Sequence, residues 1–210
     1  MTEPITPRRK RRLSDIFRLP KKESREDDSS SKYKYGKKSI LFIGDLVADK
    51  NELVNTYLNG KYLAGKPQKV DDEVIVKRLD DEGKCKVVIM TCEGEENYPG
   101  NRKKLYEGRN VVVLTYAVDN LESFKNIEEL WLPEVAFYDE GAYLGLIGTH
   151  SESDAVVTQE EVLQFAKNNN IPFVAEVSAK NYSNVDEAFF DLIIKAVNAD
   201  FEKKGLPLIK

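Results

Sequence analysis

Short apolar runs recur along the chain from residue 40 onwards, bounded by glycine or polar residues. The first run, Ile40-Leu41-Phe42-Ile43, ends at Gly44. Such a bounded run is typical of a strand that is buried on both faces of a sheet. We therefore predict strands at residues 40–43, 74–79, 87–90, 111–116, 143–147 and 171–177.

Segments with helical spacing alternate with these runs. Residues 50–59 carry apolar side chains at positions 53, 54, 57 and 58, which share one face of a helix. The same spacing predicts helices at 120–137 and 185–201. Pro133 predicts a kink or a break within the first of these two.

Two local signals define how neighbouring elements begin and connect. Thr158, followed three residues later by Glu161, is typical of a capping box that opens a helix extending to about residue 168. Residues 80–83 form a short link that contains glycine. A link of this kind predicts that strands 74–79 and 87–90 pair as an antiparallel hairpin.

The predicted elements follow the order β-α-β-β-α-β-α-β-α-β-α. This alternation is typical of an α/β domain with a mostly parallel sheet and helices on both faces. We expect six strands, of which the hairpin contributes one antiparallel edge strand. Ligands of such sheets bind beyond the carboxyl ends of the strands. Those ends lie near Gly44, Thr91, Ala117, Gly148 and Val177.

The composition of the chain changes at residue 39. Residues 1–38 contain 13 Lys and Arg against 6 Asp and Glu, a net charge of +7, whereas the whole chain carries −4. Few apolar residues lie in this segment, so it cannot bury enough surface to offset the entropy of ordering. We predict a disordered basic tail over 1–38, one domain over 39–204 and a short tail over 205–210.

Residues at the predicted strand ends resemble the motifs of the Ras-superfamily small GTPases. Residues 44–51 (GDLVADKN) stand in the place of the phosphate loop G-x-x-x-x-G-K-[ST], and residues 90–96 (MTCEGEE) in the place of W-D-T-A-G-Q-E. Residues 148–152 (GTHSE) replace G-N-K-x-D, and residues 176–180 (EVSAK) match E-T-S-A-K closely. The resemblance implies a P-loop NTPase-like small G domain over about residues 38–204.

Two further stretches, 119–124 and 131–135, are similar to the Rho branch of this superfamily. That branch has a helical insert after its N-K-x-D motif, and residues 152–178 are too short to hold one. The sequence therefore leaves Rho-like and Rab-like ancestry as alternatives.

The phosphate loop keeps Gly44, but Asp49 replaces its second glycine. A phosphate loop works because consecutive backbone N–H groups point at the phosphates. A carboxylate about 4 Å from a phosphate charge costs roughly 4 kcal/mol at an effective dielectric constant of about 20. Lys50 keeps the position of the phosphate-binding lysine, and we expect Asp49 to be its nearest partner and to neutralise it.

The resemblance implies magnesium ligands at three positions, which hold Asn51, Lys69 and Thr91 in this chain. Magnesium needs several oxygen ligands, usually with carboxylate charge. We therefore expect no metal site.

The hydrolytic position is also altered, because Glu95 stands where the family has a water-positioning glutamine. Its negative charge opposes attack on a γ-phosphate. Gly94, which the resemblance identifies as the γ-phosphate sensor, is kept, but a loop glycine also serves a turn alone. No catalytic residue is expected at the degenerate positions Glu95 and Thr91.

The guanine end of the site is better preserved. Glu152 could supply the carboxylate that guanine recognition needs, and the resemblance implies that Ser178, Ala179 and Lys180 form the element whose backbone N–H reaches the base. The alternative is that this loop only caps the neighbouring strand and helix. His150, the only histidine, replaces the family lysine and has no positioned partner that the sequence identifies.

These substitutions indicate a pseudoGTPase, an atypical Rho/Ras-like family member that acts in signalling or scaffolding by binding a protein partner without GTP hydrolysis. The expected contact surface is the switch-like segments 61–76 and 93–106. No cofactor is expected. The alternative is a GTP-binding small GTPase with weak or unusual activity, in which GTP or GDP occupies the site.

The two ends of the chain suggest a localisation signal but no lipid anchor. No cysteine ends the sequence, so we expect no C-terminal prenylation. The basic run Arg8-Arg9-Lys10-Arg11-Arg12 is open to three interpretations: nuclear import, contact with anionic membranes, or a solvated tail. Ser14 follows it in a context typical of a basophilic kinase site. We expect a cytoplasmic protein, with nuclear or peripheral membrane location as alternatives, and no specific nucleic-acid partner.

Overall fold

The computed structural model describes residues 21–22, 33–65, 68–81, 83–92, 99–139 and 141–209. Several residues discussed above lie outside these ranges, namely the basic run at 8–12, Ser14, Gly94 and Glu95. Their roles stay predictions.

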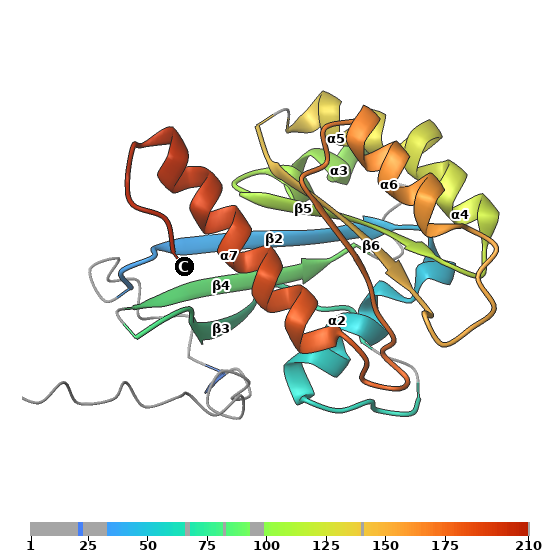
Figure 1. Ribbon diagram of the computed structural model, residues 1–210, viewed down its shortest axis with the longest axis horizontal. Helices are drawn as coiled ribbons and strands as arrows, with labels where there is room; N and C mark the ends of the chain where they lie inside the picture. The colour runs from blue at the N-terminus through green and yellow to red at the C-terminus, as the bar shows by residue number, and fades with distance from the viewer. Residues whose placement is uncertain are drawn as a thin grey trace, which may run out of the picture.

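Six strands form where the apolar runs predict them (Figure 1). Along the central strand, Ile40 and Phe42 belong to one core cluster, whereas Leu41 and Ile43 belong to another. Because successive side chains of a strand point to opposite faces, both faces of the sheet are buried. The strands are β2 (Lys37–Gly44), β3 (Glu73–Arg78), β4 (Lys84–Thr91), β5 (Val111–Ala117), β6 (Tyr143–Thr149) and β7 (Phe173–Glu176).

The strand order is β1-β3-β4-β2-β5-β6-β7. Strands β4, β2, β5, β6 and β7 are mutually parallel, and β3 pairs antiparallel with β4, which confirms the predicted hairpin. A two-residue strand, β1 (Lys21–Lys22), pairs antiparallel with β3, so β3 is not the outermost strand as predicted. Two lysines carry no apolar pattern, which is why the sequence does not indicate this seventh strand.

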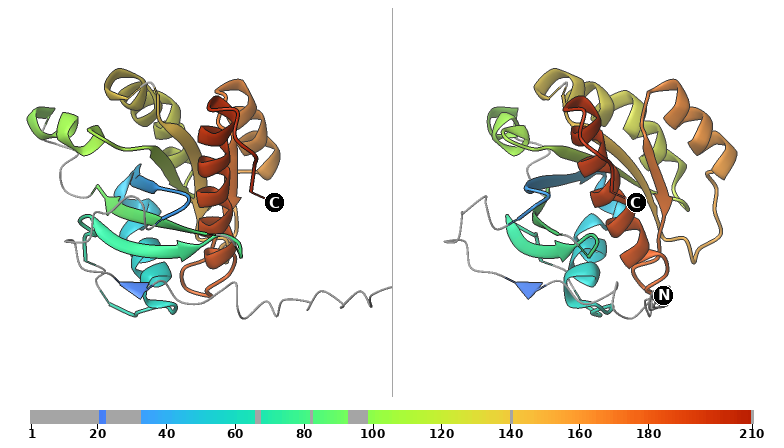
Figure 2. Two further views of the ribbon diagram at one scale, coloured as in Figure 1. Left: turned by 90° about the vertical axis from the view of Figure 1, so that its left-hand side faces the viewer. Right: turned by 60° about the vertical axis from the view of Figure 1, so that its left-hand side comes forward.

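Helices cover both faces of the sheet (Figures 1 and 2). Helices α2 (Lys50–Asn59) and α7 (Val185–Lys203) pack on the face that holds Phe42, where the rings of Tyr57 and Phe189 stack at 3.9 Å. Helices α3 (Pro99–Tyr106) and α6 (Gln159–Asn168) contribute to the other face. The predicted order includes a helix at the place of α3, and the structure supplies its bounds.

The helix predicted at 120–137 is divided into three pieces. Helix α4 (Leu121–Asn126) leads into η3 (Ile127–Trp131), a turn of π-helix, and α5 (Leu132–Tyr138) follows. Pro133 is the second residue of α5, and the π-helical turn just before it changes the hydrogen-bond pattern where the missing N–H of proline would otherwise interrupt the helix. The predicted kink or break corresponds to this π-helical turn, which falls just before the proline, and the backbone stays helical at both of its junctions.

The packed domain extends beyond 39–204 at both ends. Tyr33 and Tyr35 are buried and β2 begins at Lys37. Ile209 is also buried, and its backbone N–H and carbonyl bind the side chain of Asn198. Among the described residues, no helix is both long and apolar enough to span a bilayer.

Candidate nucleotide site

Five strands end where the candidate motifs begin. Because β4, β2, β5, β6 and β7 are parallel, their carboxyl ends meet at one edge of the sheet (Figure 1). The loop 44–51 follows β2, and residues 148–152 follow or end β6. The fold therefore brings the predicted motif positions together.

Gly44 is required by packing alone. Its φ is +141°, and a Cβ at this position would lie 2.1 Å from the carbonyl oxygen of Thr115 on β5. No side chain fits there, so this glycine is explained without any phosphate.

The loop after Gly44 folds into a turn of 3₁₀-helix, η2 (Leu46–Ala48). The N–H of Ala48 donates to the carbonyl of Asp45 at 3.1 Å, and the N–H of Asp49 donates to that of Leu46 at 3.0 Å. Two loop amides are thus bonded within the loop. Asp49 itself adopts a left-handed conformation (φ 45°, ψ 39°), which aspartate tolerates better than most residues.

Lys50 is buried at the start of α2, and its ammonium donates to the carbonyl of Gly44 at 2.7 Å. The prediction that Asp49 is the nearest partner of Lys50 is wrong. The carboxylate of Asp49 instead pairs with Nε2 of His150, at 3.1 Å.

His150 bridges two carboxylates, one on each side of its ring. Nε2 lies 3.1 Å from Asp49, and Nδ1 lies 3.2 Å from Asp119, in the loop that follows β5. The hydrogen bond to Asp49, followed by that to Asp119, raises the pKa of His150 to about 9, although partial burial opposes the change. The imidazolium is therefore charged at neutral pH, and the sequence-based statement that His150 has no positioned partner is corrected.

Asp45 anchors the other end of the loop. Its Oδ2 accepts from Nδ2 of Asn126 at 2.7 Å, and its Oδ1 accepts from the indole N–H of Trp131 at 2.8 Å. Sequence analysis missed Asp45, Asn126, Trp131 and Asp119 as site residues. The signal for Asp45 and Asp119 was available, because each lies within two residues of a predicted strand end.

The positions implied for magnesium do not fit that ion. Asn51 is buried in α2, and Lys69 brings a positive charge. Thr91 is fully buried, and its hydroxyl accepts the N–H of Val70 at 2.9 Å while its own N–H donates to the carbonyl of Val70. Among the described residues there is also no cluster of three His, Cys, Asp or Glu that could hold a metal ion.

The segment 68–72, at the place of a switch, is tied to the rest of the domain at three points. Besides the Thr91 contact with Val70, Asn55 donates to the carbonyl of Gln68 at 2.7 Å. Arg109 pairs with Asp72 at 2.7 Å. These contacts come from α2, from β4 and from the residues before β5, so the protein itself supports this segment.

The residues predicted for the guanine end lie close to one another. Glu152 and Lys180 are exposed, and both act electrostatically on Glu52, whose pKa is raised by burial and then by the charge of Asp49. Ser178 and Ala179 are buried, and Ser178 bridges to Ser183 through two backbone hydrogen bonds. These contacts are those expected of a loop that caps a strand and a helix.

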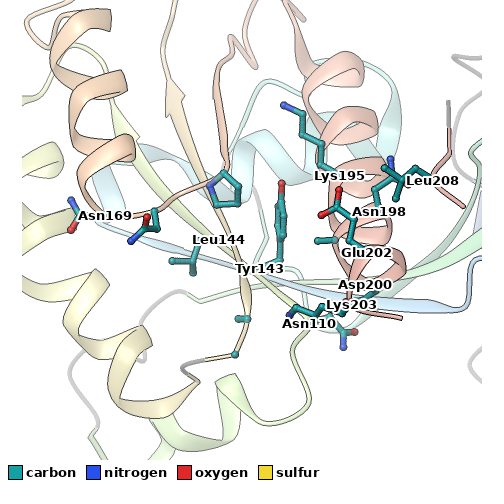
Figure 3. A pocket seen from close by; sticks show the side chains of 15 residues that line it. Asn110, Tyr143, Leu144, Asn169, Lys195, Asn198, Asp200, Glu202, Lys203 and Leu208 are labelled. Atoms are coloured by element: carbon teal, nitrogen blue, oxygen red, sulfur yellow. The ribbon is translucent and has the colours of Figure 1, made fainter. Parts of the chain in front are cut away.

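A cavity of about 680 Å³ opens elsewhere, at the amino ends of β5, β6 and β7 (Figure 3). It contains none of the predicted site residues. Its lining includes Asn110, Tyr143, Pro172, Lys195 and Asn198.

The fold and the motif positions agree with comparisons to known proteins. A sequence model of the Ras family matches residues 39–198, and the chain belongs to this family. Ras-related protein RABD2b of Arabidopsis thaliana is 32% identical over 71% of this chain and 75% of its own. GTP-binding protein YPTM2 of Zea mays is 30% identical over the same shares.

A further relative, GTP-binding protein ypt1 of Schizosaccharomyces pombe, is 29% identical over 73% of this chain and 76% of its own. These relatives are of the Rab and Ypt type, which corrects the predicted resemblance to the Rho branch. The short stretches 119–124 and 131–135 that suggested Rho are outweighed by similarity over some 154 residues.

Proposed function

We propose that this Ras-family protein is a pseudoGTPase, which binds a protein partner and does not use a guanine nucleotide. The observation that carries the proposal is the closed loop at 44–51. Its Ala48 and Asp49 amides are bonded within a 3₁₀ turn, and Asp49 stands at the position of the second glycine of the motif. Backbone amides that are already paired are poor partners for a phosphate.

The switch-like segments 61–76 and 93–106 are the surface that we propose for the partner. In nucleotide-dependent switches, such segments are ordered by γ-phosphate and magnesium. Here the contacts of Val70 with Thr91 and of Asp72 with Arg109 supply that support. A partner would then bind a surface whose conformation does not depend on a nucleotide. Residues 93–98 lie outside the described residues.

A second candidate function is GTP binding with weak or unusual hydrolysis. Membership of the Ras family favours it, as do relatives named as GTP-binding proteins. On similarity alone this alternative is the stronger one. The site residues Asp49, Lys69 and Thr91 favour the first proposal instead.

One experiment separates the two candidates. The full chain is purified, denatured, and assayed for released nucleotide. The pseudoGTPase proposal predicts less than about a tenth of an equivalent of guanine nucleotide, because the amides of Ala48 and Asp49 are already bonded within the loop and are poor partners for a phosphate. Guanine nucleotide near one equivalent would establish the second candidate. A purified RABD2b-type relative serves as the positive control.

A further inference from the structure

The loop 44–51 carries two carboxylates, Asp45 and Asp49, and each is held by a different part of the domain. We propose that the contact of Asp45 with Asn126 and Trp131 is an internal latch that keeps the loop closed over the place of the phosphate cradle. The inference rests on the proposed function and concerns the regulation of the same site. On this view, Asp45 and Asp49 hold the two ends of the loop in place.

The π-turn η3 is what makes the latch geometrically feasible. In an α-helix, residues five positions apart are rotated by about 140° about the axis, because each step turns about 100°. Asn126 and Trp131 would then face different directions. In η3 the N–H of Leu132 donates to the carbonyl of Ile127, five residues earlier, so the turn is wider than an α-helical turn and residues five positions apart are rotated less about the axis. Asn126 and Trp131 therefore reach the same carboxylate.

Both oxygens of Asp45 are used by this pair, at 2.7 Å and 2.8 Å. The donors differ in kind, an amide and an indole, and Trp131 is buried while its indole N–H donates to the loop. Hydrogen bonds to an ionised group are about twice as strong as neutral ones. The carbonyl of the same residue accepts the N–H of Ala48, so fixing Asp45 also fixes the 3₁₀ turn.

The far end of the loop is held independently. Asp49 pairs with His150, which in turn pairs with Asp119. Glu52, Glu152 and Lys180 complete the charged groups around this bridge. Replacing Asp49 alone would therefore remove the misplaced charge but leave the loop closed by Asp45. The effect of the latch can therefore be measured separately from the effect of replacing the second glycine of the motif by Asp49.

A double-mutant cycle tests the latch in the full chain. Asp45→Ala and Trp131→Phe are measured singly and together by thermal unfolding. We expect each single change to lower the melting temperature by roughly 3 to 6 °C, and the double variant to lose clearly less than the sum of the two, because the hydrogen bond that Asp45 and Trp131 share is lost only once. Tyr138→Phe on α5 is the matched control, because it removes one polar atom without contacting Asp45. Additive effects of Asp45→Ala and Trp131→Phe would overturn the proposal.

Nucleotide affinity gives a second readout. A variant with Asp49→Gly, Asn51→Ser and Thr91→Asp is titrated with a fluorescent GDP analogue and magnesium, with and without Asp45→Ala. We expect the added Asp45→Ala to raise affinity about tenfold, because the latch no longer opposes opening of the loop. Equal affinity, or no binding by either variant together with an additive cycle, would overturn the latch. Nucleotide bound by the unmodified chain would contradict the proposed function instead, and the cycle alone would then decide the latch.

Discussion

At the scale of single residues, the site is defined by where charges are paired. Asp49 would repel a phosphate if it were alone, but the structure gives it His150 as a partner. The histidine is in turn balanced by Asp119. In the sequence, these substitutions indicate only the loss of a nucleotide site. In the structure, they also form an ionic bridge between the loops after β2, β5 and β6.

The bridge predicts a stability that depends on pH. The pKa of His150 is raised from 6.5 to about 9, so the charged form is favoured in the folded state. The stabilisation is fully present below about pH 6.5, declines as the pH rises, and is lost above about pH 9. We expect about 1 kcal/mol, less than the full shift implies, because solvent screens the half-exposed Asp49.

The measurement is urea unfolding of the wild type and His150→Gln at pH 6, 7.5 and 9.5. The stability difference between the two proteins should shrink as the pH rises. His150 is the only histidine, so no other histidine titrates in this window. A difference that stays constant with pH would exclude the ionic bridge.

At the scale of elements, the end of β4 supports the switch-like segment directly. Thr91 stands where the family resemblance places a carboxylate that helps to hold magnesium, and its hydroxyl binds the N–H of Val70. In the proposed pseudoGTPase, this hydrogen bond takes the place of a contact through a metal ion. The element is held without a ligand.

Thr91→Val tests this contact. The change keeps the shape of the side chain but leaves the buried N–H of Val70 without its hydroxyl acceptor, so we expect a loss of about 1 to 3 kcal/mol of unfolding free energy. Amide hydrogen exchange at Val70 should become faster. Thr91→Ser, which retains the hydroxyl, is the matched control and should exchange at Val70 more slowly than Thr91→Val. Identical exchange in wild type and Thr91→Val would contradict the argument.

At the scale of the whole molecule, the domain is supported by contacts that do not require a ligand. The core clusters on the two faces of the sheet, the three ties of segment 68–72 and the bridge at His150 all come from the chain itself. The stability of the protein should therefore be independent of nucleotide and metal.

Thermal unfolding with 1 mM GTP and magnesium, and separately with EDTA, tests this independence. A protein that bound GTP with a dissociation constant of about 1 μM would gain roughly 4 kcal/mol under these conditions, or about 10 °C in melting temperature. We expect a change of less than about 1 °C in either case. A shift of several degrees with GTP, or a fall with EDTA, would favour the GTP-binding alternative. ATP is the control nucleotide.

The sequence by itself determined the elements and the places of the motifs. The continuous apolar run of β2, the helical spacing of residues 50–59 and the capping box of Thr158 are local patterns, so each can be recognised without knowing which residues pack against it. The antiparallel hairpin and the break near Pro133 follow from backbone chemistry and could be predicted in the same way.

Only the tertiary structure decided which charges meet. Asp49 is 101 residues from His150, and Asp45 is 86 residues from Trp131. No local pattern encodes such pairs, because they depend on the alignment of strand ends and on the π-turn that rotates Trp131 toward the loop. For the same reason the partner predicted for Lys50 from its neighbour in sequence was wrong: Asp49 pairs with His150, and Lys50 donates to the carbonyl of Gly44.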